Sequence, residues 1–398
     1  MDLRVIAIAL LEGLFALWLL KKLGLHDTKK NIAASLVLVA AALTARLLVF
    51  DYETLDYQNF LSRWVDFFRE NGGFAALKDP VGNYNIPYLY FLALFSYSGI
   101  SDLYLIKLLS TLFDIVLAYS AARLVGLVRG GRGRMRGCFF AVLFLPTVFL
   151  NGALWGQCDS IYVAFAILAV CLALDGKPVS AMVCMAVSFG FKLQAVFVMP
   201  VFVVLWAQGK FKLRHFLVFP AAYVLLVLPA VLAGRPFTDT LMLYYDQSYT
   251  VGSALNYNSP SVYSFFYNVA DEAGAARAGI IAAFAFMAAV LAGSLFSKRR
   301  SSPAVTLGAA VLLSIGIPFL LPHMHDRYFF AADVLTLCMA FADPLCIPAA
   351  AAAQFASLLG YHAYLKMRYL LPMKYGALAL IFALAAAAAF YIKEESRE

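Results

Sequence analysis

The sequence predicts an all-α integral membrane protein that crosses the bilayer many times and forms a single transmembrane domain over residues 1–398. Three observations lead to this prediction. Hydrophobic residues make up 63% of the chain and charged residues only 14%, with a mean hydropathy of +0.81. Apolar runs recur from one end to the other, and each is long enough to cross a hydrocarbon core of roughly 30 Å as a helix. Basic residues gather in short clusters between these runs.

The basic clusters set the expected orientation. They lie near residues 21–30, 129–136, 210–214 and 298–300. Because cytoplasmic loops are enriched in Lys and Arg, we place these clusters in the cytoplasm, at the inner face of the plasma (inner) membrane. This distribution accounts for the net charge of +8 without a nucleic-acid partner, which would require a basic patch or stripe on one face.

With the basic clusters inside, we expect about 11 to 13 membrane-spanning helices. The apolar segment 86–100 is expected to be a juxtamembrane or re-entrant helix, because a second crossing there would place the basic loop at 129–137 outside. The expected spans lie near residues 3–20, 31–50, 102–128, 138–153, 160–175, 179–194, 196–208, 216–233, 277–296, 303–321, 329–343, 345–361 and 375–392.

Two large outer loops follow from this topology, residues 51–100 and 234–276. The motifs WGQCD and HMHDRY fall on the same side, where we expect the functional site. Lys366, Arg368 and Lys374 also fall outside, against the rule that basic residues stay in the cytoplasm.

The first outer loop is acidic, with six acidic and three basic residues in 51–85. Asp56 opens a segment, YQNFLSRWVDFFRE, whose apolar residues at 57, 60, 61, 64, 67 and 68 share one helical face. This pattern predicts a helix lying flat on the outer membrane surface. One interpretation of Asp56 is the N-cap of that helix. The other is a carboxylate at the membrane boundary that accepts a proton from a substrate hydroxyl, with Asp51 and Glu53 as neighbouring alternatives.

Two further polar motifs interrupt apolar runs on the same side. In LWGQCDSIY, Trp155, Gln157 and Asp159 are candidates for substrate contact, although the polar pair would equally suit a helix cap. Lys192, followed by Gln194, lies inside an apolar stretch, where an ionisable residue usually faces a partner or a water-filled cavity. Lys192 therefore either snorkels to the outer interface or holds an anionic headgroup.

The motif HMHDRY stands at an outer helix end. Arg327 suits bidentate recognition of phosphate, with a structural ion pair as the alternative. His323 and His325 are two residues apart, which is a weak zinc signal, and no CxxC motif is present, so we predict no metal site. A divalent ion stays open only if Asp56, Asp159 and the two histidines converge in the fold.

Four ionisable residues lie within apolar runs away from these motifs: Glu12, Arg46, Asp114 and Asp333. A charge in the hydrocarbon region usually pairs with another charge or with backbone carbonyls. We therefore expect internal ion pairs among them and assign them no functional role.

The order of the motifs resembles a known family. The segments LDYQNFLSRW, GGFAALKDPVGNYNIPYLYFLAL, LIKLLSTLFDIVLAY, WGQCDSIY, FKLQAVFVMP and HMHDRYFFAADVL are similar in order and spacing to bacterial membrane mannosyltransferase-like proteins. These belong to the GT-C glycosyltransferase superfamily, in the group related to GPI-anchor mannosyltransferases. The resemblance covers roughly residues 40–345. It implies a GT-C-type helix bundle, a polyprenyl-phosphate-linked sugar donor, inversion at the anomeric carbon, and an essential acidic residue in the first large outer loop, which Asp56 fits best.

The residues agree with this chemistry. A sugar 1-phosphate leaves as a phosphate anion and needs no general acid, so one carboxylate base is enough. Preorganised cations stabilise the leaving anion, and Lys192, Arg327 and His325 are the candidates. No glycine-rich nucleotide-binding motif is present, which favours a lipid donor. Contacts to the substrates are expected from Asn83, Tyr84, Trp155, Gln157, Asp159, Gln194, His323 and Tyr328.

We therefore expect a glycosyltransferase that moves a hexose, mannose by resemblance, from a polyprenyl-phosphate donor to a hydroxyl of a glycan, lipid or protein acceptor at the outer face of the membrane. The alternative is a transporter or flippase of a lipid-linked or polar substrate. A transporter would place charged residues along a path through the bilayer midplane, beside broken helices. The polar motifs gather on one side instead, which favours an enzyme.

Overall fold

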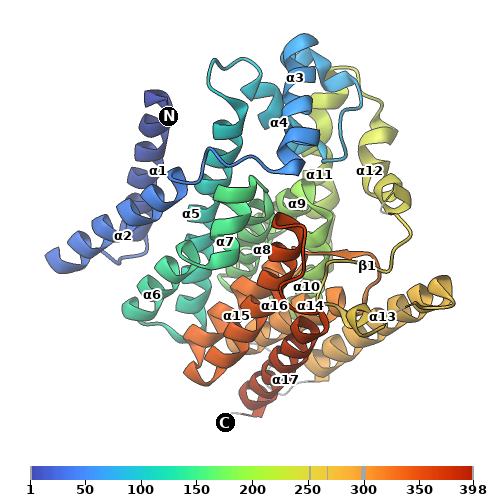
Figure 1. Ribbon diagram of the computed structural model, residues 1–398. Coiled ribbons are helices and arrows are strands. Elements are labelled where there is room, and N and C mark those ends of the chain that lie inside the picture. The colour runs from blue at the N-terminus through green and yellow to red at the C-terminus, as the bar shows by residue number, and fades with distance from the viewer. Residues whose placement is uncertain (1, 251, 267, 297–301, 397–398) are drawn as a thin grey trace.

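The computed structural model describes residues 2–250, 252–266, 268–296 and 302–396, and nearly all of the regular structure is helical (Figure 1). Two short strands, β1 (Asn256–Tyr257) and β2 (Met324–His325), pair in parallel and are a small departure from the all-α prediction. The α-helices of the described residues are α1 (Leu3–Lys22), α2 (Lys29–Leu47), α3 (Ser62–Glu70), α4 (Ile86–Phe95), α5 (Asp102–Arg129), α6 (Arg132–Leu143), α7 (Pro146–Phe149), α8 (Asp159–Leu174), α9 (Pro178–Phe191), α10 (Val201–Ala207), α11 (Val218–Leu232), α12 (Phe237–Thr250), α13 (Glu272–Phe296), α14 (Pro303–Leu320), α15 (Phe330–Ala342), α16 (Ile347–Leu365) and α17 (Lys374–Ser396).

Eight helices in the described part of the chain are long and apolar enough to cross a membrane. A bent pair, Arg132–Leu143 followed by Pro146–Trp155 at 44°, adds a ninth if it forms one span. By helix length and hydropathy the chain is therefore a multi-pass membrane protein. The eight helices are Leu3–Lys22, Lys29–Leu47, Asp102–Arg129, Leu213–Leu232, Glu272–Phe296, Pro303–Leu320, Pro344–Leu365 and Lys374–Ser396.

The remaining predicted spans coincide with shorter apolar helices. The longest of them, α8 with 16 residues, extends about 24 Å at about 1.5 Å per residue, which is less than the hydrocarbon core. In the interior of the bundle α8 packs against α5 and α9. The count of 11 to 13 spans depends on these shorter helices and stays a prediction. The shorter apolar helices at these predicted spans are Asp159–Leu174, Pro178–Phe191, Leu193–Ala207 and Phe330–Ala342.

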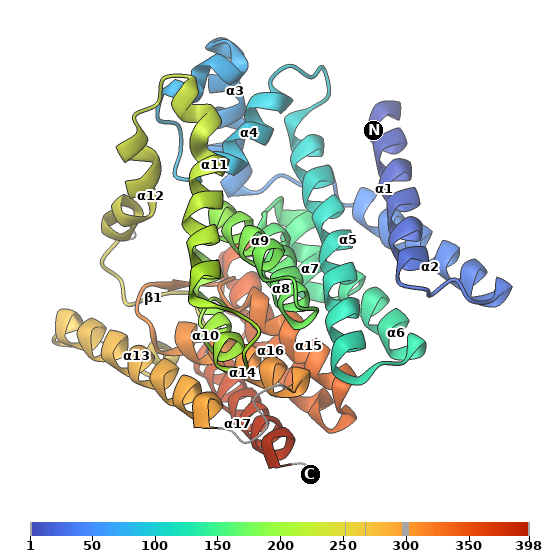
Figure 2. The same cartoon turned by 180° about the vertical axis from the view of Figure 1, so that it is seen from behind.

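The end of the molecule that contains residues 51–100 is built from short helices. Figure 1 and Figure 2 show α3, α4 and α12 gathered at one end, with the C-terminal end of α17 at the other. Helix α4 has ten residues, too few for a full crossing, as expected for the segment 86–100. The side chain of Asn85 accepts a hydrogen bond from the N–H of Ile86, and Pro87 sits in the first turn, where its missing N–H leaves no helical bond unmade.

The helix predicted to follow Asp56 begins as a π-helix over Tyr57–Leu61 and continues as α3. The wider π turn shifts the helical faces. Phe60, predicted on the apolar face, is therefore 49% exposed, whereas Val65, outside the predicted set, is fully buried. The buried face packs against α4 and residues 73–78. Single π turns are rare in helices and frequently occur at functional sites.

A buried ion pair joins the N-terminal half of the bundle, as predicted. Arg46 of α2 donates from Nε and Nη2 to Oδ2 of Asp114 in α5, at 3.1 and 3.0 Å, and neither side chain is more than 1% exposed. Arg46 also donates to the carbonyl of Leu143 at 2.9 Å, and Ser160 donates to Oδ1 of Asp114 at 2.5 Å. These contacts join α2, α5, α6 and α8.

The ion pairs predicted for Asp333 and Glu12 are not formed with any cation among the described residues. Asp333 of α15 accepts a hydrogen bond from Oγ of Ser357 in α16 at 2.8 Å instead. Oε2 of Glu12 is buried and has no hydrogen-bond partner in the described structure. The apolar pattern thus located these two buried acids but not their surroundings.

Lys107 of α5 is fully buried and holds the start of the first outer loop. Its Nζ donates to the carbonyls of Val49, Phe50 and Tyr52 at 3.1, 2.8 and 2.6 Å. An ammonium group has three donors, so all three are used. The three carbonyls follow the end of α2, and holding them positions the chain that leads to Asp56.

Replacing Arg46 with Met is expected to lower the stability of the protein by about 3–5 kcal/mol, because Asp114 becomes an uncompensated buried charge. The matched control, Arg69→Met, removes an exposed ion pair with Asp66 and a longer one, 4.0 Å, with Asp102, and should cost about 1 kcal/mol or less. Thermal unfolding in detergent measures both effects. Adding Asp114→Leu to Arg46→Met should recover most of the loss, and no recovery would contradict this account.

Candidate functional site

The carboxylate of Asp56 is held by three neutral donors. Trp155 Nε1 and Gln157 Nε2 donate to Oδ2, both at 2.8 Å, and Oη of Tyr364 donates to Oδ1 at 2.5 Å. The side chain makes no capping hydrogen bond to the helix that follows, so the N-cap interpretation is wrong. Because a carboxylate has about four acceptor positions, one position on Oδ1 remains for a ligand.

Asp159, in the first turn of α8, is the buried centre of the site, with 2% of its side chain exposed. Oδ1 accepts from Nζ of Lys192, and Oδ2 accepts from Nδ2 of Asn151, both at 2.7 Å. Nε of Arg327 lies 3.6 Å from Oδ2. A buried carboxylate requires such compensation. Asp159 therefore positions two of the predicted cations.

Lys192 marks the point where α9 breaks. The helix ends at Phe191, and Lys192 has an extended backbone (φ −150°, ψ 138°) before a 3-10 turn at Leu193–Phe197. Its side chain is 8% exposed and reaches Asp159, not the outer interface, so snorkelling does not describe it. Nζ also lies 5.6 Å from the ring centre of Tyr84, within cation–π distance.

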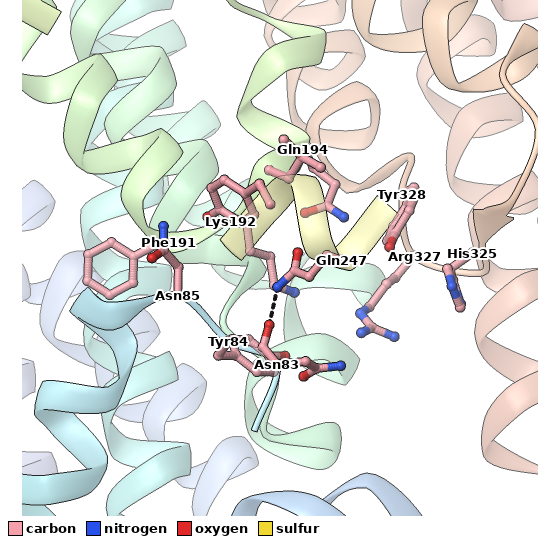
Figure 3. Close-up of a pocket in the computed structure, with 12 residues that line it drawn as sticks. Asn83, Tyr84, Asn85, Phe191, Lys192, Gln194, Gln247, His325, Arg327 and Tyr328 are labelled. Carbon is pink, nitrogen blue, oxygen red and sulfur yellow. Dashed lines mark hydrogen bonds between the residues drawn. The ribbon is translucent and has the colours of Figure 1, made fainter. Parts of the chain in front are cut away.

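Two cavities adjoin at these residues. The first, the Lys192 cavity, has a volume of about 270 Å³, and the second, the Asp56 cavity, about 510 Å³. His325 and Arg327 line both and form the shared wall between them. Predicted site residues that line the Lys192 cavity are Asn83, Tyr84, Lys192, Gln194, His325, Arg327 and Tyr328 (Figure 3). The Asp56 cavity is lined by Asp56, by the two residues of the shared wall, and by others that include Asp326, Tyr364 and Arg368.

The two cavities differ in charge. Of the described residues, Lys192 and Arg327 line the Lys192 cavity and no carboxylate does. Figure 3 shows the two side chains approaching it from different sides. The Asp56 cavity carries two carboxylates, Asp56 and Asp326, together with Arg327 and Arg368. The first cavity suits an anion, and the second suits a ligand that offers a hydroxyl to a carboxylate.

Gln157 and Trp155 connect the two cavities but line neither. Gln157, 2% exposed, accepts from Oη of Tyr84 at 2.8 Å while it donates to Asp56. The ring of Trp155 lies 5.1 Å from the guanidinium of Arg327 while its Nε1 donates to Asp56. Predicted as substrate contacts, both residues in this geometry hold the Asp56 carboxylate, and Trp155 also contacts Arg327.

The strand pair positions the shared wall. The ring of His325 on β2 stacks on Tyr257 of β1, with the ring centres 4.7 Å apart. His323 has a left-handed backbone (φ 61°), and its Nδ1 lies 2.8 Å from the carbonyl of Ala254. His323 therefore contacts the 252–258 segment and lines neither cavity, unlike His325.

Burial changes the protonation of two residues beside Arg327. Burial, reinforced by the Arg327 charge, lowers the pKa of His325 to about 4, so its imidazole is neutral near pH 7. A neutral imidazole can donate a hydrogen bond to a phosphate but adds no charge. Burial raises the pKa of Asp326 to about 7, although Arg327, 3.6 Å away, opposes the shift. The positive charge of the Lys192 cavity therefore comes from Lys192 and Arg327.

Within the described ranges, no three His, Cys, Asp or Glu side chains are placed to hold a metal ion. The convergence of Asp56, Asp159, His323 and His325 that the sequence left open is not formed. Neutral donors occupy the Asp56 carboxylate, Lys192 engages Asp159, and the His323 ring contacts backbone.

The contributors to the site that were not predicted include Asn151, Tyr364 and Arg368. Tyr364 lies 308 residues from Asp56 in the chain, and Asn151 belongs to the π-helix Leu150–Trp155. A tyrosine at the end of an apolar helix and a π turn have no sequence signature of their own. Arg368 did have a signal, because the expected topology places it on the outer side, against the charge rule.

The chain matches no protein-family model and no curated protein. The resemblance to GT-C enzymes therefore rests on the motifs of the sequence.

His325 and Asp326 are expected to give opposite pH dependence to stability. Between about pH 4 and 6.5 the unfolded state binds more protons at His325, so this site adds stability as the pH rises. Between about pH 4 and 7 the folded state binds more protons at Asp326, so this site loses stability as the pH rises.

Replacing either residue should reveal the pH dependence of stability that comes from the residue that remains. In thermal unfolding in detergent, Asp326→Asn should leave stability rising from pH 4 to 6.5, and His325→Gln should leave it falling from pH 4 to 7. Identical profiles for the wild type and both variants would contradict the assignment.

Proposed function

We propose that this protein is an inverting GT-C-type glycosyltransferase that moves a hexose, with mannose the first candidate, from a polyprenyl-phosphate-linked donor to a hydroxyl acceptor. The acceptor belongs to a glycan, lipid or protein at the outer face of the plasma membrane. The observation that carries the proposal is the pair of adjoining cavities, one lined by cations and the other by Asp56, with His325 and Arg327 between them.

The Lys192 cavity has the features that a sugar phosphate requires. Lys192 and Arg327 line it without a carboxylate, so a phosphate there meets positive charge. The guanidinium geometry of Arg327 suits two phosphate oxygens at once. Asp159 holds both cations before any ligand arrives, and preorganised cations stabilise a developing anion without rearrangement. Gln194 lines the same cavity and can bind sugar hydroxyls.

The neutral donors support Asp56 as the base. No cation forms an ion pair with Asp56 in the part of the chain that the structure describes. Trp155, Gln157 and Tyr364 orient the carboxylate without neutralising it. Gln157 also contacts Tyr84, so the base is linked to the side of the donor.

The reaction is a single displacement. The acceptor oxygen bonds to the anomeric carbon while the bond from that carbon to the phosphate oxygen breaks, and the electron pair leaves with polyprenyl phosphate. The hydroxyl proton passes to Asp56. Attack on the face away from the leaving phosphate inverts the anomeric carbon, which agrees with Asp56 lining one cavity and Lys192 the other.

The helix bundle supports a lipid-linked donor. Helices Leu213–Leu232 and Glu272–Phe296 are only 17% buried over their apolar windows, which leaves most of their surface for lipid. A prenyl chain can therefore remain in the bilayer while its sugar phosphate reaches the Lys192 cavity. The outward orientation follows from the basic clusters and is part of the proposal.

Asp56→Asn is expected to lower sugar transfer by about 10²- to 10⁴-fold, the usual contribution of a general base. Binding of polyprenyl phosphate should change little, because Asp56 does not line the Lys192 cavity. Transfer of radiolabelled mannose from polyprenyl-phosphate mannose to extracted membrane acceptors measures the first effect, and equilibrium binding the second. The matched control is Asp66→Asn, an exposed acid of α3 in the same loop, which should keep its activity.

Full activity in Asp56→Asn would refute the base assignment. A product with retained anomeric configuration by NMR would refute the single displacement. Wild-type vesicles that move a lipid-linked sugar across the bilayer without transferring it would favour a transporter or flippase instead.

Lys192→Met combined with Asp159→Asn should separate binding from folding. Lys192→Met alone leaves Asp159 buried without its closest cation and should lower the melting temperature. The double variant removes both charges and should recover the melting temperature. It should still bind undecaprenyl phosphate about 10- to 100-fold more weakly, the effect of losing one hydrogen bond to a charged group. Wild-type affinity in the double variant would show that Lys192 has a structural role only.

A further inference from the structure

Residues 366–374 carry three cations on a segment expected outside the membrane. Lys366, Arg368 and Lys374 of the sequence KMRYLLPMK are all exposed; the first two follow α16, and Lys374 begins α17. Cytoplasmic loops normally hold the excess of Lys and Arg, so cations on the outer side need another explanation. Among the residues that the structure describes, none of the three forms an ion pair with a carboxylate.

Arg368 lines the Asp56 cavity without a neutralising partner. The other lining cation, Arg327, has carboxylate oxygens of Asp159 and Asp326 at 3.6 Å, whereas no ion pair is formed by Arg368 among the described residues. Asp56 accepts from neutral donors only. Arg368 thus brings a charge that no described carboxylate offsets into the cavity that holds the proposed base.

The backbone around Arg368 has an unusual conformation. Met367 follows the C-cap of α16 with a left-handed φ of 51°, at a position where helices commonly place glycine. Met367 is 72% exposed and lines the Asp56 cavity, so core packing does not explain it. Asn258, with φ 57°, lines the same cavity. Residues in sparsely populated backbone regions cluster at ligand sites.

We propose that the acceptor bound in the Asp56 cavity carries a phosphate or a carboxylate, which Arg368 binds while the acceptor hydroxyl faces Asp56. The inference rests on the proposed glycosyl transfer and narrows its acceptor from any hydroxyl compound to an anionic one. The cavity, about 510 Å³, is within the usual range of ligand pockets, about 300–1,000 Å³.

The space continues beyond Arg368. Asn258 and Tyr369 line both the Asp56 cavity and a neighbouring cavity of about 620 Å³, which Lys374 also lines. Oη of Tyr369 donates to Oδ1 of Asn258 at 2.5 Å, at the junction of the two. An acceptor longer than one sugar therefore has room past Arg368 and meets a second cation there.

Two sources share this chemistry, the phosphate of a lipid headgroup and a soluble anionic sugar. The test compares two matched pairs of probes on the full-length protein in phosphatidylcholine nanodiscs. Phosphatidylinositol is set against neutral glucosyl diacylglycerol, and glucose 6-phosphate against glucose. The wild type should bind the phosphorylated member of at least one pair about tenfold more tightly, because it adds a hydrogen bond to a charged group. The pair that shows the preference identifies the source.

Arg368→Met should abolish the preference. Arg63→Met, an exposed arginine of α3 that lines neither cavity, is the matched control and should retain it. Equal binding within both pairs would overturn the inference, as would a preference that survives Arg368→Met. A preference lost only in Lys192→Met/Asp159→Asn would assign the phosphate to the Lys192 cavity and would also overturn it.

Failure of the anionic-acceptor inference can be distinguished from failure of the proposed function, because the binding measurements need no sugar donor. Transfer to neutral and phosphorylated acceptors with equal efficiency would refute the anionic acceptor and leave the transferase in place. Absence of any transfer from polyprenyl-phosphate sugars would refute the transferase itself.

Discussion

The carboxylate of Asp159 lies at the start of α8 with 2% of its side chain exposed, and a charge in that position is stable only when cations and donors surround it. Lys192 reaches it from the break after α9, Asn151 from the π-helix before α8, and Arg327 from the turn after β2. Compensating one buried charge thus brings three separate segments together. It also leaves two cations at the wall of the Lys192 cavity, already in place for an anion.

Asp56 has the opposite surroundings. Its partners among the described residues are neutral donors, which orient the carboxylate without forming an ion pair with it. Trp155 connects the two arrangements, because its Nε1 donates to Asp56 and its ring contacts the guanidinium of Arg327. Two π-helices, Tyr57–Leu61 and Leu150–Trp155, adjoin these residues. The irregular helices therefore lie where the site needs side chains aimed away from regular faces.

The helices were largely predictable, and their polar contacts were not. Segments expected at 3–20 and 102–128 are α1 and α5, because a long apolar run forms a helix whatever its neighbours are. Phe60 was expected to share the apolar face of a regular helix, but a π turn intervenes, and Phe60 is 49% exposed while Val65 is buried. His323 and His325 looked equivalent in sequence. His323, however, has a left-handed backbone and lines neither cavity, whereas His325 lines both.

By itself, the sequence determined that the chain is a multi-pass helical membrane protein and that its polar residues fall in a few motifs, since hydropathy is a property of each segment. Only the tertiary structure decided which motifs share a wall. It joined Asp56 to Tyr364 across 308 residues and put Arg368 in the same cavity. The physical reason is that a hydrogen bond or ion pair depends on distance and direction between segments. Helix packing and local breaks set those quantities, and no single stretch of sequence contains them.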